Sequence, residues 1–284
     1  MPPPVPFPPP AARPRLALLD AGLGLLAAAA ALRRLRPDAD LVLTSDPDGM
    51  PWGPRTPADL AARAMAVAEA AAAYHPDALV VACNTATLHA LPALRTRFEP
   101  GVPVVGTVPA VRPAALHGGP VAVWATPATT GSSGQRALID AFADGVRVAE
   151  VACPGLSDAV ERADEEAVGA AVAAAVERTP ADVRAVVLGC THYELIAGHV
   201  RAGFLRAGRP PVELHGTADA VAAQTLRRIG VPARPYAPAV GTLRVYHSGR
   251  PAALPPAALA YPEGRALLSG TDAAAGEGGG GRGR

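Results

Sequence analysis

The chain has 284 residues with 26 basic and 25 acidic side chains, and every basic side chain is an arginine because no lysine occurs. Without lysine there is no ε-amine to hold pyridoxal phosphate, to complete a Walker-type phosphate loop or to pair ATP phosphates as in protein kinases. The net charge of +1 supplies no long-range field, so we expect neither nucleic acid nor a membrane as a partner. A small, roughly neutral partner is favoured.

The N-terminal segment is rich in proline and is not typical of a signal peptide. MPPPVPFPPP lacks a basic start and a continuous apolar run, so we expect residues 1–13 to form a disordered arm. The apolar stretch from Leu16 to Leu32 is short for a membrane span and contains Asp20, and we interpret it as a strand, a turn and a helix. Three cysteines, an odd number, fit a reducing cytoplasm better than a disulfide scaffold.

Short apolar runs alternate with longer alanine-rich segments along the rest of the chain. This alternation predicts βαβ units, and runs that are apolar at every position are typical of parallel strands covered on both faces. The predicted fold class is therefore α/β with mainly parallel sheets. The strand candidates are RLALL (15–19), DLVLT (40–44), DALVVA (77–82), VPVVG (102–106), PVAVWA (120–125), VRVAEVA (146–152), VRAVVLG (183–189) and PPVEL (210–214).

Two cysteines occupy matching positions in an internal similarity. In ALVVACNTATLHAL (78–91) and AVVLGCTHYELI (185–196), an apolar strand ends at Cys83 or Cys190 and a helix follows. A cysteine near a helix N-terminus lies beside free backbone amides that favour its thiolate, so we expect a lowered pKa. Both cysteines are therefore candidate acid/base groups.

The same similarity predicts two pseudo-symmetric three-layer α/β domains. We expect the first domain to cover 14–107 plus 216–268 and the second to cover 108–215, with the active site in the cleft between them. Ligands of open α/β sheets bind beyond the carboxyl ends of the strands. A strand at TLRVYHS (242–248) would return the chain to the first domain. The glycine-rich residues 269–284 predict a disordered tail.

The other polar residues at strand ends leave alternatives open. Asp20 either faces the same crevice or caps a helix that starts at about Leu23. His192 is either a site residue or a satisfied structural histidine. Cys153 also ends a strand, and we interpret it as a small buried hydrophobe. No C-x-x-C pair occurs and the cysteines come from separate strands, so we predict no metal site.

Two facing cysteines suit the inversion of a carbon acid. One group takes the α-proton from one face while the other returns a proton to the opposite face, so one sulfur is a thiolate and the other a thiol. This chemistry needs no cofactor, which fits a chain that cannot hold pyridoxal phosphate. The site has to be dry and preorganised, because an amino-acid α-proton is weakly acidic. The residues thus favour a cofactor-independent racemase with a small amino-acid substrate.

Two motifs carry a family resemblance. VVACNTAT (80–87) and VLGCTHYELI (187–196) are similar, almost letter for letter, to the cysteine motifs of the cofactor-independent glutamate racemases, in the aspartate/glutamate racemase superfamily. The resemblance covers about residues 15–223. It implies two α/β domains with the substrate between them, and interconversion of L- and D-glutamate for peptidoglycan precursors. Weaker matches in the right order are LLDAGLG (18–24), SDPDGMPWG (45–53), PVVGTVPAVRPA (103–114), ATPATTGSS (125–133) and ACPGLSDAVE (152–161).

The resemblance also implies roles for individual residues, and no cofactor. Cys83 would be the proton donor and acceptor for the D-enantiomer, with Asp20 assisting it. Cys190 would serve the L-enantiomer, with His192 assisting it. The implied substrate-binding residues are Ala21, Trp52, Gly53, Asn84, Thr85, Thr191 and His192, and the implied auxiliary residues are Asp46, Glu161 and Thr129.

Three positions depart from the family's pattern. Ala21 replaces a serine, which removes a hydroxyl contact worth about 1 kcal/mol, and Leu25 replaces a glycine. Trp52 replaces the usual tyrosine. These changes leave the substrate open between glutamate, aspartate, a hydantoin and an amino acid of secondary metabolism. A ligand-binding paralogue without turnover is a further alternative, and a homodimer is left open.

Overall fold

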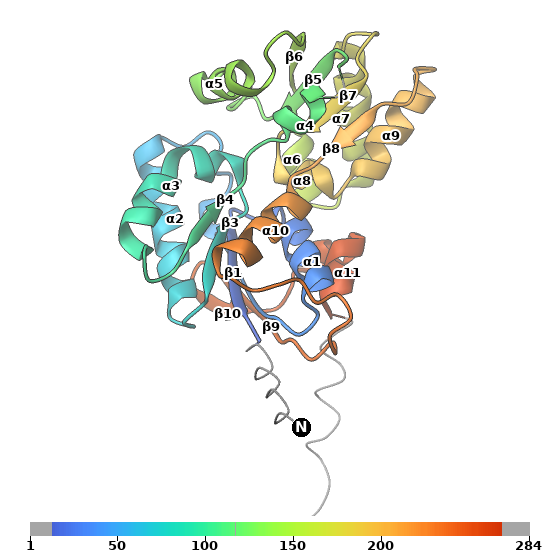
Figure 1. The fold of residues 1–284 in the computed structure, drawn as a ribbon. Helices are drawn as coiled ribbons and strands as arrows, with labels where there is room; N and C mark the ends of the chain where they lie inside the picture. The colour runs from blue at the N-terminus through green and yellow to red at the C-terminus, as the bar shows by residue number, and fades with distance from the viewer. Residues whose placement is uncertain (1–12, 117, 269–284) are drawn as a thin grey trace, which may run out of the picture.

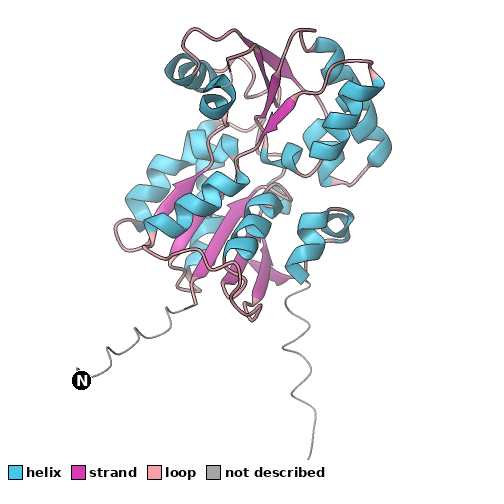
Figure 2. Ribbon diagram, turned by 45° about the vertical axis from the view of Figure 1, so that its right-hand side comes forward, coloured by secondary structure: helices cyan, strands magenta, loops and turns pink. Residues whose placement is uncertain are grey.

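Two α/β domains lie one above the other in the computed structural model, which describes residues 13–116 and 118–268 (Figure 1). Each domain is a sheet with helices on both faces (Figure 2). The predicted α/β class with mainly parallel sheets is therefore confirmed. The predicted arm up to residue 12 and the predicted tail from residue 269 lie outside the described residues, and the proposed domain boundaries stay a prediction.

The first sheet has six strands in the order β10-β9-β2-β1-β3-β4. Neighbouring strands run parallel, except that β10 pairs antiparallel with β9. The strand predicted at 242–248 is confirmed as β9, and its pairing with β2 returns the chain to this sheet. The strands are β1 (Arg15–Asp20), β2 (Asp40–Ser45), β3 (Ala78–Val81), β4 (Val104–Gly106), β9 (Leu243–His247) and β10 (Arg250–Ala252).

Alternate residues of β1 supply the cores on the two faces of this sheet. Leu16 and Leu18 belong to the apolar cluster beside α1, whereas Ala17 and Leu19 belong to the cluster beside α2 and α3. Because both faces are covered, the strand is apolar at consecutive positions. One face carries α1 (Leu25–Leu35), α10 (Ala218–Arg228), η2 (Pro256–Ala260) and α11 (Pro262–Leu268), and the other carries α2 (Pro57–Ala72) and α3 (Asn84–Phe98); η1 (Pro47–Gly49) follows β2.

The second sheet has four parallel strands in the order β6-β5-β7-β8. Helices α4 and α5 cover one face, and α6 to α9 cover the other with a core that is continuous with that of the first domain. The strands are β5 (Val121–Ala125), β6 (Val148–Ala152), β7 (Ala185–Leu188) and β8 (Glu213–His215). The helices are α4 (Val111–Leu116), α5 (Ser133–Phe142), α6 (Leu156–Glu161), α7 (Glu165–Arg178), α8 (Thr191–Glu194) and α9 (Ala197–Arg206).

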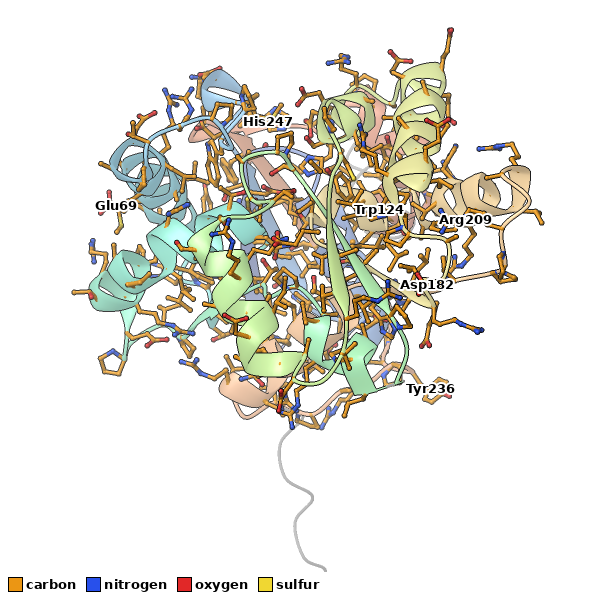
Figure 3. The ribbon with its side chains drawn as sticks, turned by 90° about the horizontal axis from the view of Figure 1, so that it is seen from above. Glu69, Trp124, Asp182, Arg209, Tyr236 and His247 are labelled. Atoms are coloured by element: carbon orange, nitrogen blue, oxygen red, sulfur yellow. The ribbon has the colours of Figure 1, made fainter. Side chains whose placement is uncertain are left out.

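Trp124 is the largest side chain in the core of the second domain. Its indole N–H donates to Thr179 Oγ1 at 2.9 Å, which satisfies the one polar atom of a fully buried ring. The ring stacks on Phe204 with 5.9 Å between centroids, and the Arg209 guanidinium lies 5.0 Å from the Phe204 ring (Figure 3). An aromatic anchor thus joins β5 to α9 in a core that is otherwise mostly aliphatic.

Helix α1 begins later than the sequence pattern predicts, at Leu25 and not at about Leu23. Its N-cap is Gly24, which offers no side-chain cap. Asp20 accepts a hydrogen bond from the adjacent Ala21 N–H at 2.6 Å and lines the pocket between the domains, so the interpretation of Asp20 as a helix cap is wrong. The five alanines of α1 favour a helix and let it pack closely against α10 and α11.

A buried ion pair fastens the loop after α1. The Arg36 side chain is 0% exposed and donates to both carboxylate oxygens of Asp38, at 2.7 and 2.8 Å. We expect Asp38→Ala to lower the free energy of unfolding by about 3 kcal/mol, because it leaves a buried guanidinium unpaired. Denaturant unfolding followed by circular dichroism measures this change.

The matched control is the exposed Arg34–Asp219 pair, whose side chains are 61% and 87% exposed. Solvent screens such a pair, so Asp219→Ala should cost less than about 1 kcal/mol. Equal losses in the two variants would contradict a structural role for burial at Asp38.

Candidate active site

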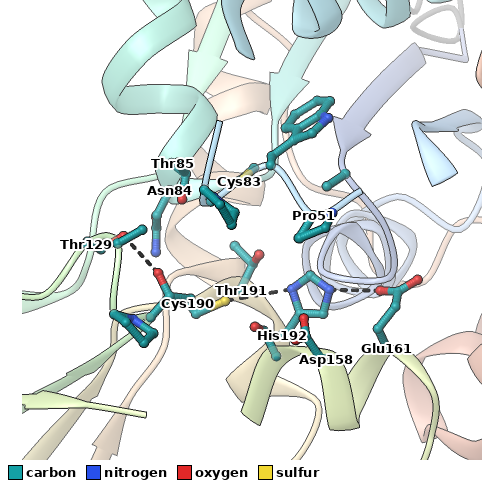
Figure 4. A pocket seen from close by; sticks show the side chains of 18 of the residues that line it. Pro51, Cys83, Asn84, Thr85, Thr129, Asp158, Glu161, Cys190, Thr191 and His192 are labelled. Atoms are coloured by element: carbon teal, nitrogen blue, oxygen red, sulfur yellow. Dashed lines mark hydrogen bonds and ion pairs between the residues drawn. The ribbon is translucent and has the colours of Figure 1, made fainter. Parts of the chain in front are cut away.

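A pocket of about 290 Å³ lies between the two domains, beyond the carboxyl ends of their strands. Figure 4 shows its polar side chains arriving from both domains. Asp46 is the one predicted site residue that does not line it. The predicted residues that do line it are Asp20, Ala21, Trp52, Gly53, Cys83, Asn84, Thr85, Thr129, Glu161, Cys190, Thr191 and His192.

The two cysteines occupy equivalent places in the two domains. Cys83 follows the fully buried strand β3 and is the N-cap residue of α3. Cys190 follows the equally buried β7, after Gly189, and is the N-cap residue of α8. Both cysteines have extended backbone angles, and the first helical residue follows directly after each of them. Parallel strands therefore deliver one thiol to each side of the pocket.

Two glycines allow this close packing. A Cβ on Gly189 would lie 2.6 Å from the Trp124 carbonyl oxygen, so a side chain there would push Cys190 away from β5. A Cβ on Gly24 would lie 2.1 Å from the Asp20 carboxylate, 2.3 Å from Thr191 Oγ1 and 2.8 Å from His192 Nδ1. The turn before α1 can reach these polar groups of both domains only because Gly24 has no side chain.

Asp20 and Cys83 lie together on the first-domain side of the pocket and share a hydrogen bond. Burial raises the pKa of Asp20 to about 6, although His192, the Ala21 N–H and a hydrogen bond with Cys83 oppose the shift. Burial, and then the nearby Asp20 carboxylate, raise the pKa of Cys83 well above its ordinary value. The lowered pKa expected for Cys83 is therefore wrong, because desolvation outweighs the helix N-terminus.

The side chains of Cys190, His192 and Glu161 form a series of contacts in the second domain. Figure 4 marks these contacts with dashed lines. The Cys190 sulfur lies 3.7 Å from His192 Nδ1, and His192 Nε2 lies 2.9 Å from Glu161 Oε2. Burial opposes protonation of His192, but the hydrogen bonds with Cys190 and Glu161 outweigh it and raise the pKa of His192 well above its ordinary value. The same Glu161 oxygen accepts a hydrogen bond from the Leu23 N–H at 2.7 Å. This series of contacts therefore links the second domain to the first.

Asn84 links the two halves of the pocket and keeps an acceptor free. Its Nδ2 donates to the Gly189 carbonyl oxygen of the other domain at 2.8 Å. Its Oδ1 is buried and has no hydrogen-bond partner among the described residues. Thr191 Oγ1 also crosses between the domains, to Asp20 Oδ2 at 3.5 Å. The Asn84 amide therefore bonds across the cleft through its nitrogen, and its residue lines the pocket beside the two cysteines.

Three further polar residues line the pocket that were not predicted individually from the sequence. Thr126 follows β5 and bonds to Thr129 at 3.2 Å, and Ser157 and Asp158 lie in the first turn of α6, after β6. All three lie just beyond the carboxyl ends of strands. The rule that located the cysteines would therefore have found them, had it been applied to every strand of the second sheet.

Cys153 is not part of the pocket. It is 1% exposed, its sulfur donates to the Val151 carbonyl at 3.6 Å, and burial raises its pKa to about 12. It is a buried apolar residue, as its sequence context indicates.

Within residues 13–116 and 118–268, no three histidine, cysteine or acidic side chains gather into a metal-binding group. No helix of this part of the chain is long and apolar enough to cross a membrane.

Comparisons with known proteins point to one family. The sequence profile of the family described as Asp/Glu/Hydantoin racemase matches residues 24–225. The glutamate racemase of Roseiflexus sp. (strain RS-1) is 42% identical over 199 residues, which are 67% of this chain and 71% of that protein. The glutamate racemase of Pseudomonas putida (strain W619) is 38% identical over 65% of this chain and 73% of that protein.

Solved structures agree with this result. The Escherichia coli glutamate racemase, crystallised with L-glutamate and the activator UDP-MurNAc-ala, aligns with a TM-score of 0.73 and 27% identity, over 92% of this chain and 95% of that one. The Thermus thermophilus glutamate racemase, in complex with β-chloro-D-alanine, aligns with a TM-score of 0.63 and 30% identity, over 83% and 87% of the two chains.

The raised pKa of Asp20 implies that the free energy of unfolding depends on pH. A carboxyl whose pKa rises from 3.8 to about 6 on folding contributes stability that is complete below pH 3.8 and is lost as the pH rises through 6. The loss amounts to about 3 kcal/mol. We therefore expect Asp20→Asn to unfold with a higher free energy than the wild type at pH 8, by up to about 3 kcal/mol, and to show no such gain below pH 4.

Denaturant unfolding at the two pH values measures the difference, with Asp140→Asn as the control because Asp140 is exposed. The control should change stability by less than about 0.5 kcal/mol at either pH. An Asp20→Asn protein that is destabilised equally at pH 4 and pH 8 would show that Asp20 is not a strained acid.

Proposed function

Because the chain belongs to the Asp/Glu/hydantoin racemase family and is an isomerase of that family, we propose that it interconverts L- and D-glutamate without a cofactor. The observation that carries the proposal is the pair of thiols, one from each domain, that line one pocket from equivalent strand ends. The curated relatives are named glutamate racemase, which supports glutamate as the substrate.

The two cysteines act as the two bases. In the L-to-D direction, Cys190 takes the α-proton as the C–H bond breaks, and Cys83 gives its S–H proton to the opposite face of the same carbon. Cys190 then holds a thiol and Cys83 a thiolate, and both exchange protons with solvent before the next turnover. The raised pKa of Cys83 fits this order, because it keeps a proton on the sulfur that has to donate one.

The neighbours of the two sulfurs differ in charge. The His192 imidazolium beside Cys190 stabilises negative charge on that sulfur, and Glu161 holds the ring in place through Nε2. Asp20 lies beside Cys83, and with a pKa of about 6 it gains and loses a proton near neutral pH. It can therefore return a proton to Cys83 after each turnover.

The amino-acid head binds beside the cysteines. We assign the amino-acid head of the substrate to the side chains of Asn84, Thr85 and Thr191, which line the same pocket. These groups hold the α-carbon between the two sulfurs and exclude water, which a weak carbon acid requires.

A second candidate keeps this mechanism and changes the substrate. Ala21 and Trp52 both line the pocket, so the missing hydroxyl and the larger ring act directly on what binds there. Aspartate, a hydantoin or an amino acid of secondary metabolism are the alternatives. We further propose a cytoplasmic enzyme whose D-glutamate is used for peptidoglycan, and a homodimer stays a prediction.

We expect Cys83→Ala and Cys190→Ala each to lower kcat for glutamate racemisation by about 10³-fold or more, because each removes one of two acid/base groups. Optical rotation measures racemisation, and α-proton NMR in D₂O measures exchange. Cys153→Ala is the matched control and should stay within about threefold of the wild type, since Cys153 lies outside the pocket.

The same assay separates the candidates. Near-normal turnover in either of the first two variants would exclude the two-thiol mechanism. Exchange of L-aspartate but not L-glutamate by the wild type would favour the second candidate, and exchange of neither would favour a ligand-binding paralogue.

A further inference from the structure

The loop between β2 and α2 is held by a buried carboxylate that does not face the pocket. Asp46 is 4% exposed, and its oxygens accept three side-chain donors. Trp52 Nε1 donates to Oδ2 at 3.0 Å, Arg63 Nη1 to Oδ2 at 3.1 Å, and Ser248 Oγ to Oδ1 at 3.0 Å. Both oxygens are thus occupied, and Asp46 lies outside the set of residues that line the pocket.

Trp52 connects this carboxylate to the pocket. The indole is 2% exposed, lines the pocket, and belongs to the same apolar cluster as Ala21 and Cys83. An indole has a single N–H donor and no acceptor. One hydrogen bond therefore restricts the side-chain torsions of Trp52 to those that direct the N–H toward its acceptor. The bond to Asp46 therefore helps to set where the ring stands in the wall of the pocket.

Ser248 brings the C-terminal hairpin into this arrangement. It lies between β9 and β10, and its N–H donates to the Ser45 carbonyl at 2.7 Å. Its hydroxyl donates to Asp46 and accepts from the Asp48 N–H at 3.3 Å. On the surface, Arg250 pairs with the Asp48 side chain at 2.7 Å. The loop is thus fastened to a hairpin about 200 residues further along the chain.

We infer that Asp46 and Ser248 are positioning residues that hold the Trp52 indole as a wall of the pocket, so that the β9–β10 hairpin helps to set substrate specificity. The inference rests on the proposed racemase function. It replaces the auxiliary-acid role expected for Asp46, because a carboxylate outside the pocket with three donors on it has no path to the substrate. The chain's departures at Ala21 and Trp52 then share one setting: a small residue and a large ring that belong to the same apolar cluster and line the same pocket.

Kinetics of matched variants test the inference. We expect Asp46→Ala and Ser248→Ala to raise KM for glutamate by about 10-fold with kcat within about threefold, and to lower the preference for glutamate over aspartate. This size corresponds to the loss of one hydrogen bond to a charged group. Asp46→Asn keeps an acceptor oxygen for the indole and should restore most of the affinity. Glu69→Gln, which removes the charge of an exposed carboxylate on α2 paired at the surface with Arg97, is the control and should change neither constant.

A double-mutant cycle tests whether Asp46 acts through Trp52. Once Trp52→Phe has removed the indole N–H, adding Asp46→Ala should raise KM by less than about twofold, because the linked group is already gone. The pH dependence of kcat should be the same in Asp46→Asn and the wild type. Loss of one limb of the pH profile in Asp46→Asn would restore an acid/base role for Asp46. Independent effects of Asp46→Ala and Trp52→Phe would overturn the positioning role.

A third measurement needs no activity. The chain has two tryptophans, so its ¹H–¹⁵N spectrum contains two indole signals, which Trp52→Phe assigns. In Ser248→Ala the Trp52 indole proton should exchange with solvent about 10-fold faster, while that of Trp124, bonded to Thr179, stays unchanged as an internal control. Unchanged exchange at Trp52 would overturn the inference even in an active enzyme. An inactive wild type with faster exchange in the variant would instead refute the proposed function alone.

Discussion

Burial of parallel strands on both faces is the constraint on which the site depends. A strand such as β3 or β7 is fully buried along its length, so it can present a reactive group only beyond its carboxyl end. Two residues beyond the end of each strand lies a cysteine that is the N-cap of the next helix, and the pocket lies between the two domains at those ends. The pocket, its two thiols and the polar residues from the strand-end loops all follow from this geometry.

The two thiols have unlike surroundings, although their backbone positions match. Cys83 lies in a buried place beside a carboxyl, which keeps its proton bound. Cys190 lies beside His192, whose protonated form is stabilised by Glu161. The proposed exchange of protons across one carbon requires one donor and one acceptor at any moment, and this difference in charge would supply them. Hydrogen bonds from Asn84 and Thr191 connect the two domains beside the pocket.

Local patterns allowed every strand except β10, the fold class and the positions of the two cysteines to be predicted, because each depends on a few consecutive residues. The pKa of Cys83 was predicted in the wrong direction, since burial comes from the whole fold and outweighs the helix N-terminus beside it. The contacts of Asp46 could not be predicted, because its partner Ser248 is about 200 residues away and only the pairing of β9 with β2 brings them together. The departure at Trp52 can be recognised in the sequence, but its hydrogen bond to Asp46 depends on the folded loop.

The central claim is that two different groups handle the two faces of the α-carbon, and deuterium incorporation tests it most directly. L-glutamate is incubated with the enzyme in D₂O, and both enantiomers are analysed before a tenth of the substrate has reacted. The account predicts D-glutamate that carries deuterium at the α-carbon, because its new proton comes from Cys83 after exchange with solvent, together with remaining L-glutamate that is still protonated. D-glutamate that retains the original α-proton would mean that one group serves both faces, and would contradict the two-thiol mechanism.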